Sequence, residues 1–276
     1  MPAVRQSIFA LRAAPSPVTG RLIGLASVAL LIAVWYLVTL GAPEARLVSP
    51  TILPTPGEVV RRLLALITGS SGEAGSLALN TAASLRRVLA GFGLAILVGV
   101  PLGILAGVSG PVRAALAPHA LFLRNIPLAA LIPLTMVAFG IDEQQKTMFI
   151  FIAVVPFLLG DTMAAIVRVP ERYVETAKTR GASAAQVITK VLIPLAMPAI
   201  YGSVRTLFGL AVGYIMLAEL VNADLGLGHM LNVGQRRSDL PTIFATLVVI
   251  ATLAYVIDRL LQLLQHKIFP YRVAGE

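Results

Sequence analysis

Charged side chains that interrupt long apolar stretches are the first candidates for chemistry in this sequence. Asp161 stands within one such stretch, and Glu219 lies near the end of another, shortly before Asp224. If these stretches cross a membrane, each charge is costly there and is a functional candidate by default. For Glu219 and Asp224 two interpretations stand: a gate near Gly226 and Gly228, or a structural role.

A cationic candidate precedes a broken apolar segment. Arg124 and Asn125 come directly before a segment that two prolines interrupt and that also contains Thr135. Broken helices free backbone groups and are tolerated in membranes where they line a cavity. Arg124, Asn125 and Thr135 could therefore attract an oxyanion on a translocation path. The alternative is that Arg124 pairs with Asp161 or reaches the membrane interface.

The sequence lacks the patterns of metal, nucleotide or hydrolytic chemistry. The three histidines, His119, His229 and His266, are isolated, and cysteine is absent, which argues against a protein metal site. There is no G-x-x-x-x-G-K-[ST] phosphate loop, no G-x-S-x-G elbow and no H-E-x-x-H. We therefore expect no catalytic residue, no metal site and no cofactor in this chain.

The composition indicates a membrane protein. Of 276 residues, 57% are hydrophobic and 13% charged, compared with roughly 45–50% and about 25% in soluble domains. A soluble chain of this length has too little interior for so many apolar side chains. The net charge of +9 would suggest nucleic acid in a soluble protein, but in a membrane protein it reports which loops face the cytoplasm. No nucleic-acid partner is expected.

Six apolar runs approach the length of about 20 residues that a membrane-spanning helix needs. The predicted spans are 22–41, 88–112, 125–141, 147–167, 199–218 and 240–257. With both termini in the cytoplasm, the inner segments hold about twice as many Lys and Arg as the outer ones, which favours this orientation. Counting Arg86 and Arg87 as outer residues weakens that excess. At the outer mouth these two arginines either attract anions or contact lipid head groups.

Two further patterns concern packing and surface. Small residues recur every fourth position in the second span and predict close contact with a neighbouring helix; they are Gly91, Ala95, Gly99, Gly103 and Gly107. The outer segment 42–83 begins rich in Pro and Ser, and we expect a short amphipathic surface helix over 58–67.

The inner segment 168–198 predicts two short helices on the cytoplasmic surface. A helix over 171–178 ends at Gly181, and Ser183 is a plausible N-cap for a second helix over 184–191. Two prolines then mark the return of the chain to the membrane. Such an exposed and rigid element suits a docking surface for a soluble partner.

This segment resembles the cytoplasmic loop of the permease subunits of ABC importers. That loop reads E-A-A, three residues, G, nine residues and I-x-L-P, and this sequence keeps every spacing. The matching residues are Glu175, Thr176, Ala177, Gly181, Val191, Ile193 and Pro194, with Thr176, Val191 and Ile193 as conservative departures. The resemblance implies that the loop couples the permease to an ATPase, and Gly181 is the residue on which we expect coupling to depend.

Further motifs are similar to those of the nitrate/sulfonate/taurine-type permeases, over roughly residues 50–271. They are L-P-T-P at 53–56, S-L-R-R at 84–87, G-V-P-L-G at 99–103, I-P at 126–127, L-I-P-L at 131–134 and G-L-G at 226–228. The resemblance implies an all-α membrane protein with six transmembrane helices in the type I ABC importer permease architecture. It would comprise a cytoplasmic segment 1–21, one permease domain 22–265 and a cytoplasmic tail 266–276.

The same resemblance implies the partners. They are a second permease copy in a homodimer, two cytoplasmic ATP-binding subunits that hold ATP and Mg²⁺, and an external solute-binding protein, in a prokaryotic inner membrane. Nitrate, sulfonates, taurine, bicarbonate and a vitamin precursor are all open as the solute. The alternative function is a secondary transporter or channel that works without an ATPase.

Overall fold

The computed structural model describes residues 16–44, 46–69, 76–221 and 223–272, and within these ranges the chain forms helices and loops without a strand. The predicted terminal segments 1–21 and 266–276 lie partly outside these ranges. The helices, in chain order, are α1 (Pro17–Val38), α2 (Pro56–Thr68), α3 (Leu77–Val108), α4 (Gly110–Arg124), η1 (Leu128–Ala130), α5 (Leu131–Phe139), α6 (Glu143–Val167), α7 (Glu171–Thr179), α8 (Ala184–Val187), η2 (Ile188–Leu192), α9 (Ile193–Val221), α10 (Leu227–Arg236), α11 (Leu240–Ile268) and η3 (Pro270–Arg272).

The described helices confirm an all-helical membrane fold with five or six candidate spans. Five are single apolar helices: α1, α3, α6, α11 and the continuous helix Ala184–Val221. The sixth is a pair, α4 with the segment Leu128–Phe139, bent by 89° at its break. Long apolar runs in the sequence therefore correspond to long helices, because only a helix satisfies every backbone group within a single span.

The third predicted span is wrong as a single helix over 125–141. The chain bends after Arg124, and the predicted span contains only the short helices η1 and α5. Pro127 explains the break, because proline lacks a backbone N–H and disfavours helical geometry in the residue before it. The second span is also longer than predicted at its start, since Ser76 caps α3 by accepting from the N–H of Leu79.

The bundle is organised around α3, α6 and α9, and the small-residue stripe of α3 packs against α6 as predicted. A Cβ atom added at Gly103 would lie 2.6 Å from the Cβ of Thr162, and one added at Gly107 would lie 2.5 Å from the Cβ of Ile166. Only glycine permits this approach. The predicted close packing is confirmed, and it fixes α6 as the central helix of the bundle.

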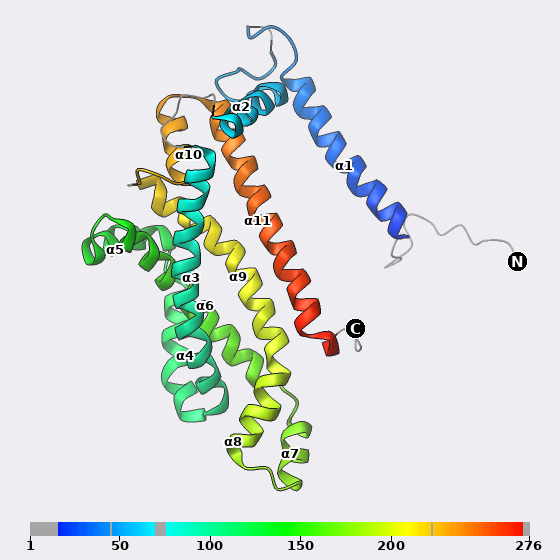
Figure 1. Cartoon of the computed structure of the whole chain (residues 1–276), viewed down its shortest axis with the longest axis vertical. Coiled ribbons are helices and arrows are strands. Elements are labelled where there is room, and N and C mark those ends of the chain that lie inside the picture. Colours follow the sequence, from blue (N-terminus) through cyan, green and yellow to red (C-terminus); the bar gives the residue numbers. More distant parts are fainter. Residues whose placement is uncertain (1–15, 45, 70–75, 222, 273–276) are drawn as a thin grey trace, which may run out of the picture.

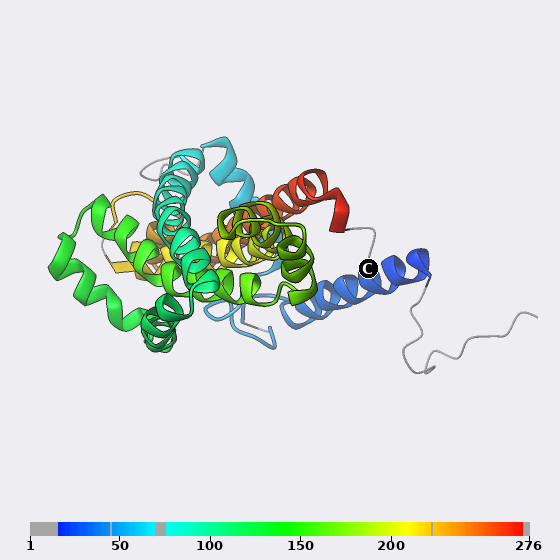
Figure 2. The same ribbon diagram turned by 90° about the horizontal axis from the view of Figure 1, so that it is seen from below.

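Helix α1 lies apart from the bundle, whereas α2 packs against α11 at one end of it. The views in Figures 1 and 2 agree that α1 lies apart from the other long helices, and none of its apolar window is buried. The indole N–H of Trp35 donates to the Pro54 carbonyl at 2.9 Å and ties the end of α1 to the start of α2. Helix α2 confirms the expected surface helix, and its Arg62 pairs with Asp239 beside α11 at 3.1 Å.

The long axis of the molecule separates two ends that matter for function. In Figure 1, α2 and α10 lie at the upper end, and α7 and α8 lie at the lower end. We call these the α10 end and the α7 end. Helix α6 begins toward the α10 end and finishes close to α7. The number of a residue on α6 therefore indicates how far it lies from each end.

Candidate functional site

The predicted cytoplasmic element lies at the α7 end, and its first helix forms where the sequence places it. Helix α7 directly follows Pro170 and spans Glu171–Thr179. Val174 is buried and anchors the helix, whereas Glu175 and Thr176 are exposed. No ion pair joins Glu175 to the part of the chain that the structure describes. The acidic residue of the motif is therefore available to a partner.

The turn between α7 and α8 depends on Gly181. Its φ of +79° is left-handed, and the N–H of Ala182 donates to the Ala177 carbonyl at 3.0 Å to close the helix end. A Cβ at Gly181 would meet no atom within 4 Å, so the space is open and the backbone conformation alone demands glycine. The turn thus presents an exposed surface of fixed shape.

Ser183 begins the second helix through a reciprocal capping box with Gln186. The N–H of Gln186 donates to Ser183 Oγ at 3.3 Å, and the N–H of Ser183 donates to Gln186 Oε1 at 2.9 Å. The helix does not end near residue 191 as predicted. It continues through a π-helical turn, Ile188–Leu192, directly into α9.

The two prolines that we expected to mark a break lie inside this continuous helix. Pro194 falls directly after the π-helical turn, whose wider hydrogen-bond spacing accommodates irregular backbone. Pro198 cannot donate to the Pro194 carbonyl, and Tyr271 Oη takes that place by donating to it at 3.0 Å. The motif residues Val191 and Ile193 are part-buried within the helix.

Arg124 and Asp161 form an ion pair between the end of α4 and α6, which is one of the two interpretations from the sequence. Arg124 Nη2 lies 3.0 Å from Asp161 Oδ1, and both side chains are about one-third exposed. The guanidinium stacks over the ring of Phe157, 4.8 Å from its centroid. Gly160 admits it, because a Cβ there would lie 2.7 Å from Arg124 Nη1. The charge stays partly accessible at the bend between α4 and α5.

The other two members of the predicted oxyanion site are engaged elsewhere. Asn125 Nδ2 donates to the Leu121 carbonyl at 2.7 Å. Thr135 is buried, and its hydroxyl accepts from Gln145 Nε2 at 3.0 Å. Within the described residues, no hydrogen bond joins either side chain to Arg124. The geometry thus leaves Arg124 with Asp161 as the polar group at this bend.

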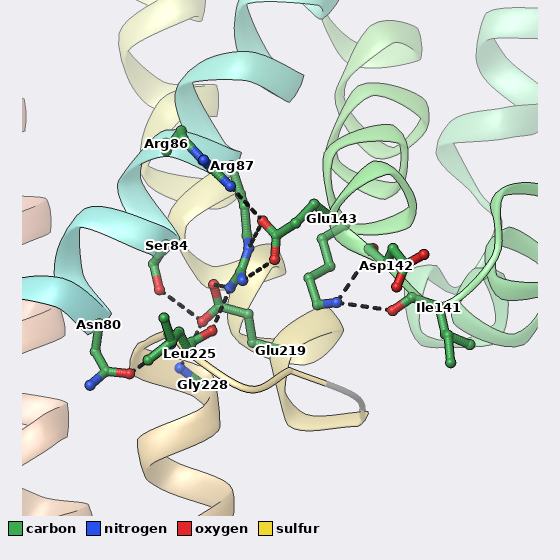
Figure 3. A network of polar contacts seen from close by, with 12 residues as sticks. Asn80, Ser84, Arg86, Arg87, Ile141, Asp142, Glu143, Glu219, Leu225 and Gly228 are labelled. Atoms are coloured by element: carbon green, nitrogen blue, oxygen red, sulfur yellow. Dashed lines mark hydrogen bonds and ion pairs between the residues drawn. The ribbon is translucent and has the colours of Figure 1, made fainter. Parts of the chain in front are cut away.

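Glu219 is the centre of a buried polar cluster at the α10 end (Figure 3). Its side chain is 0% exposed and pairs with Arg87 Nη1 at 2.7 Å. It also accepts from Ser84 Oγ and from the N–H of Gly228, both at 2.8 Å. A carboxylate in this position joins α3, α9 and the start of α10. The structural interpretation of Glu219 therefore has direct support.

Arg87 completes the cluster through ion pairs with two carboxylates, which neither interpretation of its role from the sequence included. Its side chain is 4% exposed, and it lines a pocket beside the cluster while its guanidinium is engaged by protein groups. It pairs with Glu143 at the start of α6 and donates to the Leu225 carbonyl at 2.7 Å. Arg86 is 73% exposed and pairs with Glu143 at 3.1 Å.

The chain between α9 and α10 is held by side chains from one face of α3. The N–H of Gly226 donates to Asn80 Oδ1, and the N–H of Leu227 donates to Ser84 Oγ, each at 2.8 Å. A Cβ at Gly228 would lie 2.6 Å from the Cβ of Glu219, which accounts for glycine at this position. Sequence reasoning missed Asn80 and Glu143. Asn80 could have been found from its spacing to Ser84 and Arg87, which places three polar side chains on one helix face. No such pattern marks Glu143.

The described residues contain no group of three or more His, Asp or Glu side chains that could hold a metal ion. The arrangement supplies an exposed two-helix element at the α7 end, an ion pair about one-third exposed within the bundle and a buried cluster at the α10 end.

Residues 99–270 match the family described as binding-protein-dependent transport system inner membrane component. The chain belongs to this family. The permease is 35% identical over 254 residues to a probable ABC transporter permease of Brucella abortus, covering 92% of this chain and 97% of that protein. It is 32% identical to the taurine transport system permease of Escherichia coli, covering 90% and 89%. It is 29% identical to the bicarbonate transport system permease of Synechococcus elongatus, covering 90% of each.

Solved structures confirm the fold. The methionine ABC transporter MetNI in inward-facing form matches with a TM-score of 0.60 at 21% identity, covering 76% of this chain and 97% of that chain. An amino acid ABC transporter matches with a TM-score of 0.58 at 16% identity, covering 77% and 96%. This chain is a multi-pass inner-membrane permease subunit of an ABC importer, which works with ATPase and binding-protein components.

Proposed function

We propose that this permease forms a homodimer, docks two cytoplasmic ATP-binding subunits through its α7–α8 element, and imports a small oxyanion. An external binding protein would deliver the solute to the α10 end. The ATP-binding subunits would hold ATP and Mg²⁺, because this sequence has no phosphate loop. Both termini would lie in the cytoplasm of a prokaryotic cell.

The exposed α7–α8 element is the observation that carries the proposal. It keeps the spacing of the ABC permease loop, and the unpaired Glu175 and the left-handed Gly181 present that motif on the surface. The capping box at Ser183 and the continuity into α9 make the element rigid. A rigid exposed surface can convert closure of an ATPase dimer into movement of the helices that cross the membrane.

The solute class rests on relatives and on one charge. The printed names of relatives include taurine, aliphatic sulfonates and bicarbonate, all of which are small and carry an anionic group. Arg124 is one-third exposed at the α4–α5 bend and could exchange Asp161 for a passing anion. A homodimer is supported by α1, whose apolar surface lies outside the bundle and is available to a second copy or to lipid.

The test is to express the permease with its neighbouring ATPase and binding-protein genes, purify it through a tag on the permease, and reconstitute it in liposomes. We expect an ATP-binding subunit to co-purify and ATP hydrolysis to rise when binding protein loaded with taurine, a sulfonate or bicarbonate is added. Calorimetry on the binding protein would identify the solute. Uptake that needs no ATPase would establish the alternative, a secondary transporter or channel.

A further inference from the structure

A pocket of about 720 Å³ opens at the α10 end beside the Glu219 cluster. Its walls come from α3, from the start of α6 and from the segment before α10. The charged lining residues are Arg86, Arg87, Asp142, Glu143, Lys146 and Asp224. Figure 3 shows Glu143 between Arg87 and the residues Asp142 and Ile141 that precede α6.

Lys146 is the unusual member of this set. Its residue is only 3% exposed, yet it lines the pocket. The ammonium donates to the carbonyls of Ile141 and Asp142 at 3.2 and 3.4 Å. No carboxylate of the described chain lies within 4.0 Å of it. An ammonium buried without a counter-ion is costly, so an anion that enters the pocket gains a strong partner.

Two of the carboxylates near Lys146, those of Glu143 and Glu219, are already paired with arginines. Glu143 receives hydrogen bonds from both Arg86 and Arg87, and Glu219 is paired with Arg87 behind the pocket wall. Lys146 is therefore the one cation lining this pocket that lacks an ion pair with a described residue. The start of α6 adds to the positive potential, because Asp142 at its N-cap makes no capping hydrogen bond.

Two carboxylates oppose anion binding and limit its strength. Asp142 and Asp224 line the same pocket, both residues are exposed, and neither is ion-paired in the described part of the chain. A site in which one buried cation attracts an anion and two exposed carboxylates repel it binds weakly. Weak binding is what a translocation path needs, because the solute must also leave.

We propose that this pocket is an anion-binding vestibule in which Lys146 Nζ holds the sulfonate or carboxylate head group of the solute. The proposal rests on the proposed import of an oxyanion and names the residue that receives it. Lys146 lies on α6, 15 residues before Asp161, or about 22 Å of helix rise. An anion on the path would then meet Lys146 first and, farther along α6, the pair that Asp161 forms with Arg124 of α4.

The experiment uses the assembled transporter in lipid nanodiscs without its binding protein, and methanesulfonate as the probe. Binding is measured by calorimetry at constant ionic strength. We expect Lys146→Met to weaken methanesulfonate binding about tenfold or more, and Lys146→Arg to retain it. Arg61→Met is the matched control, because it removes an exposed cation of α2 outside this pocket and should leave binding unchanged.

Three further outcomes decide the proposal. The melting temperature of Lys146→Met should stay level or rise, because the substitution removes a buried charge without a counter-ion. A fall in melting temperature with unchanged methanesulfonate affinity would mean a structural lysine and would overturn the proposal. Weaker docking of solute-free binding protein with unchanged anion binding would also overturn it, since the pocket would then receive an acidic side chain. Failure of the proposed function itself would show separately, as absence of stimulated ATP hydrolysis in the wild type.

Discussion

Removal of the Glu219 carboxylate should destabilise the permease more than loss of a carboxylate from an exposed ion pair. In Glu219→Ala, Arg87 keeps Glu143 and the Leu225 carbonyl, and the N–H of Gly228 and the hydroxyl of Ser84 lose their acceptor. Breaking a buried ion pair from one side costs about 3–5 kcal/mol. For a chain of this size that corresponds to a fall of roughly 10 °C in melting temperature.

The assay is thermal unfolding of the assembled transporter in nanodiscs, followed by the loss of monodisperse complex. Asp258→Ala is the matched control, because Asp258 and its partner Arg205 are 42% and 29% exposed. A pair of this exposure contributes at most about 1 kcal/mol. A fall in melting temperature for Glu219→Ala no larger than that for Asp258→Ala would refute the reasoning.

A double variant tests whether the cost arises from the unpaired charge. In Arg87→Met with Glu219→Met, both buried charges are removed together, and Glu143, which is 49% exposed, keeps Arg86. We expect the double variant to be no less stable than Glu219→Ala, because apolar replacement of a whole buried pair is often neutral. Additive losses from the two sites would contradict a shared ionic cluster.

Three other predictions address the coupling turn, the helix packing and the surface helix. Gly181→Val should leave membrane insertion intact but abolish transport and solute-stimulated ATP hydrolysis. Gly69→Val is its control, because it strains a left-handed glycine of similar φ at the C-cap of α2 and should leave coupling intact. Gly103→Ala should lower the free energy of unfolding by about 1–3 kcal/mol, because its Cβ would overlap an α6 side chain. Gly93→Ala, where a Cβ meets nothing within 4 Å, should leave the melting temperature almost unchanged. The backbone N–H of Thr55 lowers the pKa of Glu58 from its ordinary value of 4.5. The ionised Glu58 carboxylate therefore stabilises the fold above pH 4.5, and this stabilisation is lost as the pH falls through the lowered pKa. We expect the melting temperature of Glu58→Gln to fall less on acidification than that of the wild type.

The features that the sequence predicts well are local. The left-handed turn at Gly181 and the cap at Ser183 follow from neighbouring residues, and the glycine stripe of α3 follows from a spacing of four. The continuity of α8 into α9 was missed, because the proline rule assumes that no other donor reaches the freed carbonyl. Tyr271, 77 residues from Pro194, supplies that donor.

The candidate site was harder to predict than the fold, because its pairs join distant parts of the chain. Arg87 and Glu219 are separated by 132 residues, and hydropathy shows which segments cross the membrane without showing which helices meet. The Arg124–Asp161 pair was foreseen as an alternative because both charges stand at apolar segments. The pairing of Arg87 with Glu143 and Glu219 was missed, because these acidic partners lie on helices whose contacts no local pattern reveals.

The uninterrupted helix from Ala184 to Val221 joins the α7 end of the molecule to the α10 end. Its 38 residues correspond to a length of about 57 Å. One end begins at the Ser183 cap, and the other carries Glu219 against Gly228. If this helix tilts as one body by about 10° about one of its ends, its other end moves by about 10 Å. Movement at the α7 end would therefore reach the Glu219 cluster, apart from the share that bending at the π-helical turn Ile188–Leu192 takes up.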